Sequence, residues 1–227
     1  MKLFPVAVES LKFATDDLVT IQLKKPASYQ YRAGQFTQLA LPTASNHPRL
    51  DNWRWLSFAS APNEPLLEFA IRLGPSAFKQ TIRQLAFGDT VQIGLPQGVL
   101  QLPKVEPLYL FAGGVGIAPI RSLLFDNKRT DNVTIFYSVT DPDEALYYHE
   151  LSGLPGVTLV ATVTGKPQRP EFHFGRIDRS LLATVNFSTN GPCIIVGSPS
   201  FVNGMMRLVK NYGTPDNQIT VERFTGL

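Results

Sequence analysis

The stretch that decides the fold is residues 112–119, which read Ala-Gly-Gly-Val-Gly-Ile-Ala-Pro. An apolar run precedes it and a helix-length segment follows it. Glycines let a backbone turn tightly and approach a pyrophosphate, and the amino end of a helix favours that negative charge. Pro119 suits the first turn of a helix, where its missing N–H costs nothing. The pattern predicts a strand-to-helix turn that binds a nucleotide phosphate, although such a turn can also be purely structural.

Strands and helices are predicted to alternate from this turn to the last residues. The predicted strands are residues 108–112, 133–139, 157–163, 193–196 and 218–224, and the predicted helices are residues 117–127, 143–151, 178–185 and 201–211. Alternation with near-continuous apolar strands is typical of a doubly wound parallel sheet. We therefore predict a C-terminal α/β domain over residues 104–227, with its boundary in the proline-containing stretch 103–107.

The first half of the chain has a different pattern. Short runs with alternating apolar and polar residues, each bounded by Gly, Pro, Asn or Asp, cover residues 18–23, 34–41, 66–73 and 90–95. Strands at this spacing predict an antiparallel, closed or nearly closed β-barrel over residues 1–103. One helix, residues 76–86, is expected to interrupt the strands.

Composition limits the function classes. The chain has 227 residues, of which 44% are hydrophobic and 17% charged, as in a globular protein of two domains. The net charge of +3 is too small to predict nucleic-acid binding. Cys193 is the single cysteine, and His47, His149 and His173 lack ligand spacing, so we expect neither a metal site nor an iron–sulfur cluster. With no apparent signal peptide or membrane span, we expect a cytoplasmic protein.

Two further segments carry groups suited to anions. Arg54 opens the strand-like run Arg-Trp-Leu-Ser, where a guanidinium can pair with a phosphate and Ser57 can donate to a ring nitrogen. Arg72 precedes a Gly-Pro turn, and Ser76 is placed to begin the following helix, whose free N–H groups attract an anion. An edge-strand arginine, an ordinary strand serine and a simple helix cap are the structural alternatives.

Together these segments resemble the ferredoxin–NADP reductase superfamily over nearly the whole chain. Residues 54–60 are similar to its flavin motif, Arg-x-Tyr-Ser-x-x-Ser, and residues 113–119 to its nucleotide motif, Gly-Gly-x-Gly-(Ile/Thr)-x-Pro. Residues 88–98 resemble its Gly-Asp…Pro-x-Gly stretch, residues 196–199 its Cys-Gly-x-Pro, and residues 222–224 its C-terminal Glu-x-aromatic. The five motifs occur in the family's order.

The resemblance implies two binding sites. Its flavin site on the barrel comprises Arg54, Trp55, Leu56, Ser57, Arg72, Ser76, Ala77 and Phe78. Its nucleotide site comprises Gly113, Gly114, Gly116, Ile117, Pro119, Ser138, Gly197, Ser198, Pro199 and Phe224. In this interpretation Arg54 holds the flavin phosphate, Ser57 faces the reactive ring nitrogen and Glu222 acts near Ser57, while Phe224 covers the ring until the nicotinamide displaces it. These three residues, Ser57, Glu222 and Phe224, form the implied catalytic set.

Three departures from the motifs weaken parts of this interpretation. Leu56 stands where the family has tyrosine, so the ring contact is absent or comes from Trp55 or another residue. Val196 replaces the family's cysteine, which Ser198 can replace only in part, and Cys193 is expected to be a core thiol. Residues 225–227 extend past Phe224, so the aromatic residue is not terminal.

The implied activity is hydride transfer from NADPH or NADH to FAD, with FAD favoured over FMN. Asp141 would repel a 2′-phosphate, whereas Ser138 or Arg176 could bind one, so the nucleotide stays open. Electrons would pass to a separate acceptor: a ferredoxin- or flavodoxin-like protein, free flavin or a small oxidant. The alternative is a non-turnover flavin- and nucleotide-binding subunit of a larger electron-transfer complex. A hydrolase is disfavoured because the chain has no Gly-x-Ser-x-Gly elbow.

Overall fold

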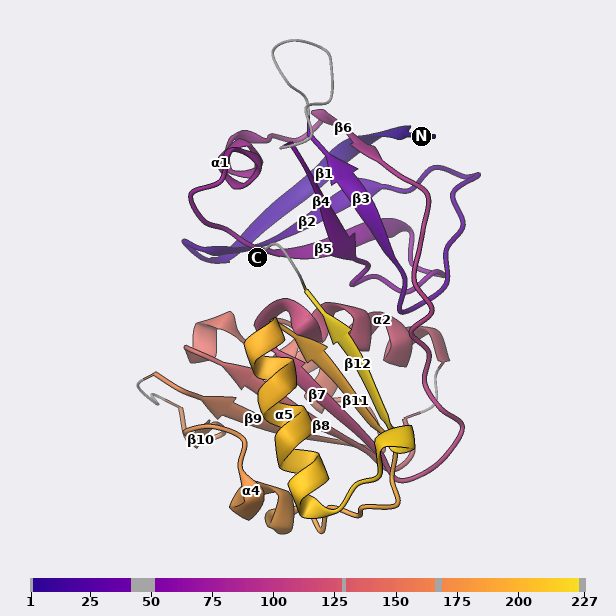
Figure 1. Cartoon of the computed structure of the whole chain (residues 1–227). Coiled ribbons are helices and arrows are strands. Elements are labelled where there is room, and N and C mark those ends of the chain that lie inside the picture. The colour runs from indigo at the N-terminus through magenta and orange to yellow at the C-terminus, as the bar shows by residue number, and fades with distance from the viewer. Residues whose placement is uncertain (1, 42–51, 128–129, 166–168, 225–227) are drawn as a thin grey trace. The chain divides into compact units, whose positions relative to one another are not determined.

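The computed structural model describes residues 2–41, 52–127, 130–165 and 169–224 (Figure 1). Contacts between residues divide the chain into two compact units. The first unit contains residues 1–101 and 121–126, and the second contains residues 102–120 and 127–227. The first is built on antiparallel strands and the second on parallel strands with helices, so the predicted fold class is confirmed.

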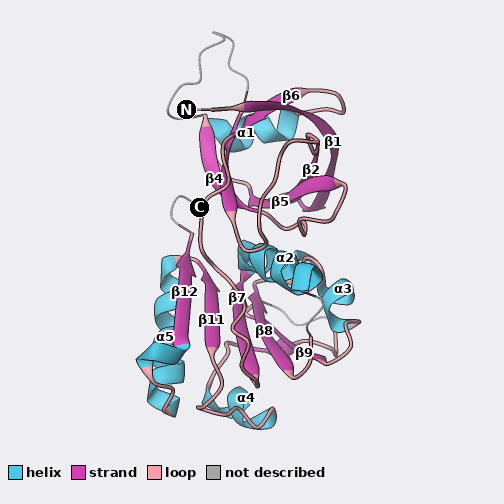
Figure 2. Ribbon diagram, turned by 90° about the vertical axis from the view of Figure 1, so that its right-hand side faces the viewer, coloured by secondary structure: helices cyan, strands magenta, loops and turns pink. Residues whose placement is uncertain are grey.

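One six-stranded antiparallel sheet forms the first unit, in the order β4-β3-β6-β1-β2-β5. Its elements are β1 (Phe4–Thr15), β2 (Leu18–Lys24), β3 (Phe36–Ala40), β4 (Trp53–Ser57), β5 (Leu66–Arg72), α1 (Ala77–Gln84) and β6 (Thr90–Ile93). The long strand β1 pairs with β6 through its first half and with β2 through its second half. The β1–β2 pairing has an irregularity between Val8 and Ser10, close to the point where the partner of β1 changes, as bulges do where a sheet curves. The outer strands β4 and β5 also contact each other, which curls the sheet into a barrel (Figure 2).

Apolar side chains from alternate strand positions fill the barrel. They include Val8, Ile21, Leu39, Phe58, Phe69 and Ile93, and α1 adds Phe78 and Ile82. Two buried tyrosines complete this core, and each phenol is hydrogen-bonded: Tyr29 donates to the Gly94 carbonyl at 2.8 Å and Tyr31 to the Ser60 carbonyl at 3.0 Å. Burial raises the pKa of Tyr29 to about 12, so its phenol stays neutral over the physiological range.

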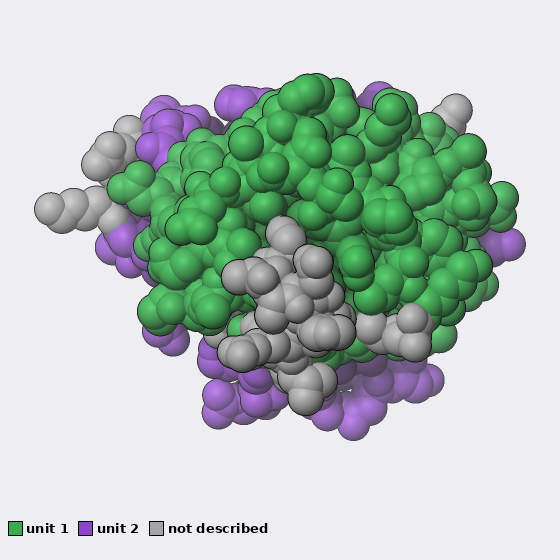
Figure 3. Space-filling view, turned by 90° about the horizontal axis from the view of Figure 1, so that it is seen from above, with its two compact units in different colours: residues 1–101, 121–126 green, residues 102–120, 127–227 purple. Residues whose placement is uncertain are grey.

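Residues 121–126 of α2 (Ile117–Asn127) belong to the first unit, which is coloured green in Figure 3. The Arg121 side chain is 7% exposed and binds both carboxylate oxygens of Glu64, at 2.8 and 2.9 Å. It also donates to the Ala59 carbonyl at 2.8 Å. Burial on its own raises the pKa of Glu64, but hydrogen bonds from Arg121 and the Ala61 N–H, with the Arg121 charge, hold that pKa below its ordinary value.

A six-stranded parallel sheet forms the second unit, in the order β10-β9-β8-β7-β11-β12 (Figure 1). Its other elements are β7 (Leu108–Gly113), η1 (Gly114–Gly116), β8 (Val133–Val139), η2 (Pro142–Glu144), α3 (Tyr148–Ser152), β9 (Val157–Val163), β10 (His173–Phe174), α4 (Arg179–Thr184), β11 (Cys193–Gly197), α5 (Pro199–Tyr212), η3 (Asp216–Gln218) and β12 (Ile219–Arg223). The helices α4 and α5 pack on one face of the sheet through Leu181, Leu182, Val202 and Val209.

The strand order of this sheet reverses between β7 and β11. From β7 the chain proceeds through β8 and β9 towards one edge, and it then returns to β11 and β12 on the other side. In open α/β sheets, ligands bind outside the carboxyl ends of the strands at such a reversal. The topology therefore directs attention to the carboxyl ends of β7 and β11.

Two sequence predictions differ from the structure. The 12-residue strand β1 was not among the predicted strands. The helix predicted at residues 143–151 is wrong: the chain forms the 3₁₀ turn η2, and then the short helix α3. Asp141 begins the 3₁₀ turn by accepting a hydrogen bond from the Asp143 N–H, and Tyr147 has a φ of 61°, which interrupts a continuous helix. Among the described residues, no helix could cross a membrane and no group of His, Cys, Asp or Glu could hold a metal.

Candidate cofactor and nucleotide sites

Strand β4 presents two different faces. Side chains alternate along a strand, so Arg54 and Leu56 share the face of their partners Leu39 and Thr37, which are fully buried. Trp55 points to the opposite face, where it is 41% exposed and packs edge-on against Phe36. Trp55 therefore does not take the place of the family's tyrosine on the face that carries Arg54.

The amino end of α1 gathers positive charge. Ser76 is the N-cap residue, as predicted, and its hydroxyl accepts the N–H of Lys79 at 3.4 Å. The Arg54 guanidinium lies over the ring of Phe78, 5.3 Å from the ring centre. Lys79 is only 9% exposed, and burial followed by the charges of Arg54 and Arg72 lowers its pKa. Three neighbouring cations beside free helix N–H groups fit a phosphate or diphosphate, because an anion relieves their mutual repulsion.

The two serines of the flavin motif have different surroundings. Ser57 ends β4 and is 8% exposed. Ser60 is 2% exposed, and its hydroxyl accepts the Glu68 N–H at 3.0 Å and contacts the Tyr31 hydroxyl at 2.9 Å. The Ser60 carbonyl accepts the Ser122 hydroxyl at 2.6 Å. These contacts make Ser60 a structural residue, whereas the role of Ser57 towards a flavin stays a prediction.

The glycine-rich turn begins where β7 ends. Gly113 is the last residue of β7, Gly114 and Gly116 belong to η1, and α2 follows at Ile117 with Pro119 in its first turn. A Cβ on Gly113 would lie 2.7 Å from the Phe201 ring, and one on Gly116 would lie 2.8 Å from the carbonyl carbon of Val196. Both positions therefore require glycine, because the turn packs directly on β11 and α5.

A second helix begins beside this turn. Gly197 ends β11 with a φ of 156°, and a Cβ there would lie 3.4 Å from the Cα of Gly113. Ser198 caps α5 by accepting the Phe201 N–H at 3.3 Å, and Pro199 is the first helical residue. The amino ends of α2 and α5 thus meet at the point where the strand order reverses. Two helix amino ends with close-packed glycines fit the pyrophosphate of a nicotinamide nucleotide.

The remaining predicted residues of this unit lie around the same turn. Ser138 is the β8 partner of Gly113, and Glu222 in β12 is the partner of Val196 in β11. The Phe224 N–H donates to the Gly197 carbonyl at 2.9 Å, which fixes its backbone beside the turn. Residues 225–227 lie outside the described residues. The joint action of Glu222 and Phe224 with Ser57 stays a prediction.

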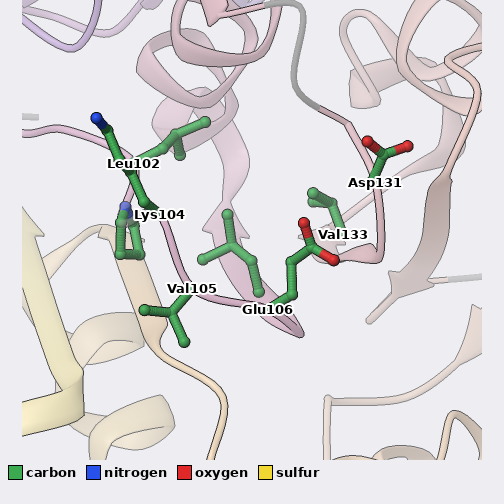
Figure 4. A pocket seen from close by; sticks show the side chains of 8 residues that line it. Leu102, Lys104, Val105, Glu106, Asp131 and Val133 are labelled. Carbon is green, nitrogen blue, oxygen red and sulfur yellow. The ribbon is translucent and has the colours of Figure 1, made fainter.

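Two small cavities lie elsewhere in the second unit. One, of about 160 Å³, is lined by Lys104, Glu106 and Asp131 and by Leu108 and Val133, the first residues of their strands (Figure 4). It therefore lies at the amino ends of the strands, the opposite end from the nucleotide turn.

The other cavity has a volume of about 260 Å³ and lies between β9, β10 and α4. Arg176, His173 and Asp178 contribute its charged and titratable side chains, and Thr162 contributes a buried hydroxyl without a hydrogen-bond partner. Arg176, which the sequence offers as a phosphate partner, therefore lies in a polar cavity rather than on a featureless loop.

Sequence reasoning did not single out Lys79, which lies at the cationic start of α1. The available signal was a lysine three positions after the serine cap, where its N–H and its charge both belong to the first helical turn. Lys79 is buried beside two arginines because β4 and β5 approach α1. A local sequence pattern does not predict that approach.

The chain thus combines an antiparallel barrel, which has a cationic helix start, with a parallel sheet that has two glycine turns at its reversal. This is the architecture that the sequence resemblance implies. The family model described as an oxidoreductase NAD-binding domain matches residues 110–207. The chain is similar to reductases of the ferredoxin–NADP reductase superfamily.

Relatives resemble the chain in sequence, and a solved structure resembles it in fold. The chain is 27% identical to the reductase component of propane 2-monooxygenase from Rhodococcus jostii over 93% of its own length and 60% of that protein. It is 26% identical to a flavodoxin/ferredoxin–NADP reductase of Rhodobacter capsulatus, over 91% of the chain and 85% of the relative. A ferredoxin NADP⁺ reductase from Neisseria gonorrhoeae, solved with FAD and NADP, superposes with a TM-score of 0.85 at 23% identity, covering 98% of this chain and 99% of that one.

Proposed function

We propose that this chain is an NAD(P)H-dependent flavoprotein reductase that binds FAD in its first unit and the nicotinamide nucleotide in its second. The observation that carries the proposal is the meeting of two helix amino ends and two close-packed glycines at the reversal of the parallel sheet. The cationic start of α1 supports the flavin half of the proposal. The chain spans only 60% of its propane 2-monooxygenase relative, so the activity of that longer protein is not transferred as a whole.

FAD, when bound, supplies the acceptor for a hydride and can then release electrons. The protein's contribution is to bind and orient, since hydride transfer needs donor and acceptor held at near-attack distance and little other side-chain chemistry. Arg54 and the N–H groups around Ala77 and Phe78 bind phosphate, and Ser57 orients the flavin ring by a hydrogen bond. The turn at Gly113–Gly116 binds the pyrophosphate of NAD(P)H, while Glu222 and Phe224 act at the nicotinamide end.

We further propose that the electrons pass to a separate acceptor. Reductase components of oxygenases and a flavodoxin/ferredoxin–NADP reductase are among the relatives, which supports a protein acceptor of that kind. Free flavin and small oxidants are the other acceptors that the proposal allows. We also propose a cytoplasmic location, because a single cysteine cannot form an internal disulfide.

Two substitutions favour one alternative function. Leu56 removes the tyrosine of the flavin motif and Val196 removes the cysteine of the nicotinamide motif. Both changes suit a non-turnover electron-transfer subunit of a larger complex, which binds its cofactors but depends on partner proteins for turnover.

The visible spectrum of the purified protein, recorded without oxygen before and after addition of NADH or NADPH, tests the proposal. Yellow flavin bands that bleach with one nucleotide would support the reductase and identify its donor. Bands that neither nucleotide bleaches would favour the non-turnover subunit. A protein that stays colourless after incubation with FAD or FMN would refute the flavin site.

The same experiment decides the choice of nucleotide. Asp141 lies just beyond β8, and its carboxylate would repel a 2′-phosphate, although it already caps η2. Arg176 lies in the cavity next to β9 and would attract one. Bleaching by NADPH alone would favour Arg176, and bleaching by NADH alone would favour repulsion by Asp141.

A further inference from the structure

Lys79 is a buried cation at the start of α1 to which the flavin motif gives no role. Its residue is 9% exposed, although lysines are seldom buried without a partner. Its ε-nitrogen lies 3.7 Å from the point where a Cβ on Gly74 would sit, so the side chain turns back over the Gly-Pro turn that leads into α1. No carboxylate of the described residues is among the groups that shift the pKa of that ammonium group.

The charges that face Lys79 are positive. Arg54 reaches it from β4 and Arg72 from the end of β5. The first turn of α1 contains no acidic residue, and Arg83, in the last turn of the helix, is paired with Asp17 at 3.0 Å. Burial first, and then Arg54 and Arg72, lower the pKa of Lys79. Such an arrangement disfavours the charged lysine until an anion joins it.

We propose that Lys79 is a phosphate-binding residue of the FAD site, where its ammonium group and the N–H groups at the start of α1 bind the diphosphate together with Arg54. This inference rests on the proposed flavin function and adds to it a residue that its motifs do not include. α1 has eight residues, and its amino end contributes free N–H groups on the side where Lys79 turns back. A diphosphate offers enough anionic oxygens to engage both cations at once.

Binding of the diphosphate beside Lys79 makes the affinity for FAD depend on whether Lys79 is protonated. In the ligand-free protein Arg54 and Arg72 oppose the charged lysine, whereas a bound diphosphate stabilises it. FAD therefore binds the protonated form, and its affinity falls as the pH rises towards the ordinary lysine pKa of about 10.4. Riboflavin has no phosphate, so its affinity does not change with Lys79.

The test compares Lys79→Met, which keeps the length of the stem, with Lys79→Arg, which keeps the charge. Lys12→Gln, on the exposed part of β1, is the matched control for a lost charge in the same unit. Dissociation constants for FAD and riboflavin are measured by flavin fluorescence at about pH 7 and about pH 10. We expect Lys79→Met to weaken FAD binding about 10- to 100-fold at neutral pH, the gain typical of a charge-assisted phosphate contact. Lys79→Arg should recover most of that loss.

Several outcomes would contradict the proposal. If Lys79→Met bound FAD as tightly as the unmodified protein, the proposed role of Lys79 would be refuted. The same holds if Lys79→Met lost as much affinity for riboflavin as for FAD. Neither result would refute the flavin function. An FAD affinity of the unmodified protein that stays constant from about pH 7 to about pH 10 would also refute the role of Lys79, and this measurement needs no variant. Unmodified protein that binds neither flavin would instead refute the flavin function itself. The melting temperature of ligand-free Lys79→Met should not fall, because the substitution removes repulsion, which distinguishes lost binding from lost folding.

Discussion

Replacing Gly116 with alanine tests the packing of the nucleotide turn on β11. An added Cβ would lie 2.8 Å from the carbonyl carbon of Val196 and 3.1 Å from the backbone nitrogen of Gly197. Comfortable separations between such atoms are about 3.5–4.0 Å, so the two backbones must separate by about 0.7 Å or more. Gly116 does not have a positive φ, so the expected effect is steric rather than conformational.

The expected destabilisation of Gly116→Ala lies at the upper end of the overpacking range, about 2–3 kcal/mol, because the obstacle is backbone and not a flexible side chain. For a protein of this size that free energy lowers the melting temperature by about 4–12 °C. Circular dichroism during heating measures it, with and without a nicotinamide nucleotide. Nucleotide affinity should fall as well, since the turn carries the proposed pyrophosphate site.

Gly204→Ala is the matched control. Gly204 lies inside α5, and a Cβ there would meet no atom within 4 Å. Alanine favours a helix over glycine by about 0.5–1 kcal/mol, so this variant should melt slightly higher than the unmodified protein. A melting temperature for Gly116→Ala equal to that of Gly204→Ala would refute the reasoning about the turn.

Three further substitutions test other parts of the structure. Arg54→Ala should weaken FAD retention by about 1.5–3 kcal/mol for each lost charge-assisted bond, and an unchanged dissociation constant would exclude a phosphate contact. Arg121→Gln should cost about 2–3 kcal/mol at neutral pH in a urea titration, because Glu64 loses its ion pair. The pKa of Glu64 is lowered in the folded state, so the ion pair stabilises the fold above about pH 4.3, and this stabilisation is lost as the pH falls through the folded pKa. The difference in unfolding free energy between Arg121→Gln and the unmodified protein should therefore disappear in acid. Thr162→Val should raise stability by about 1 kcal/mol, since it removes a buried hydroxyl that has no partner, and a destabilised variant would indicate that the cavity supplies one.

The elements with strong local patterns were predictable from the sequence. The glycine turn follows an apolar run and precedes a helix, which is sufficient to predict both β7 and the start of α2. Ser76 caps α1 as predicted, because a serine side chain accepts a free N–H, a rule that operates within a few residues. The predicted helix at residues 143–151 was wrong because Asp141 and Pro142 form a turn whose hydrogen bonds compete with a helix.

Long-range features were not predictable in this way. The face on which Trp55 lies depends on the register between β3 and β4, which the motif does not specify. The charge cluster around Lys79 combines residues from β4, β5 and α1, and the role of Ser60 depends on Tyr31 and Ser122, which are distant in sequence. Such groupings follow from tertiary packing, so a single sequence read locally cannot contain them.

The ion pair between Arg121 and Glu64 limits how this protein can be dissected. Arg121 follows the nucleotide turn in the chain, yet its contacts belong to the barrel. A barrel fragment ending near residue 101 would leave the Glu64 carboxylate without its guanidinium and the Ala59 carbonyl without its donor. Exchange of barrels between members of the superfamily should therefore succeed only when both halves of this pair come from the same parent. The part of the chain that must be transferred together therefore includes residues 121–126 as well as the barrel strands.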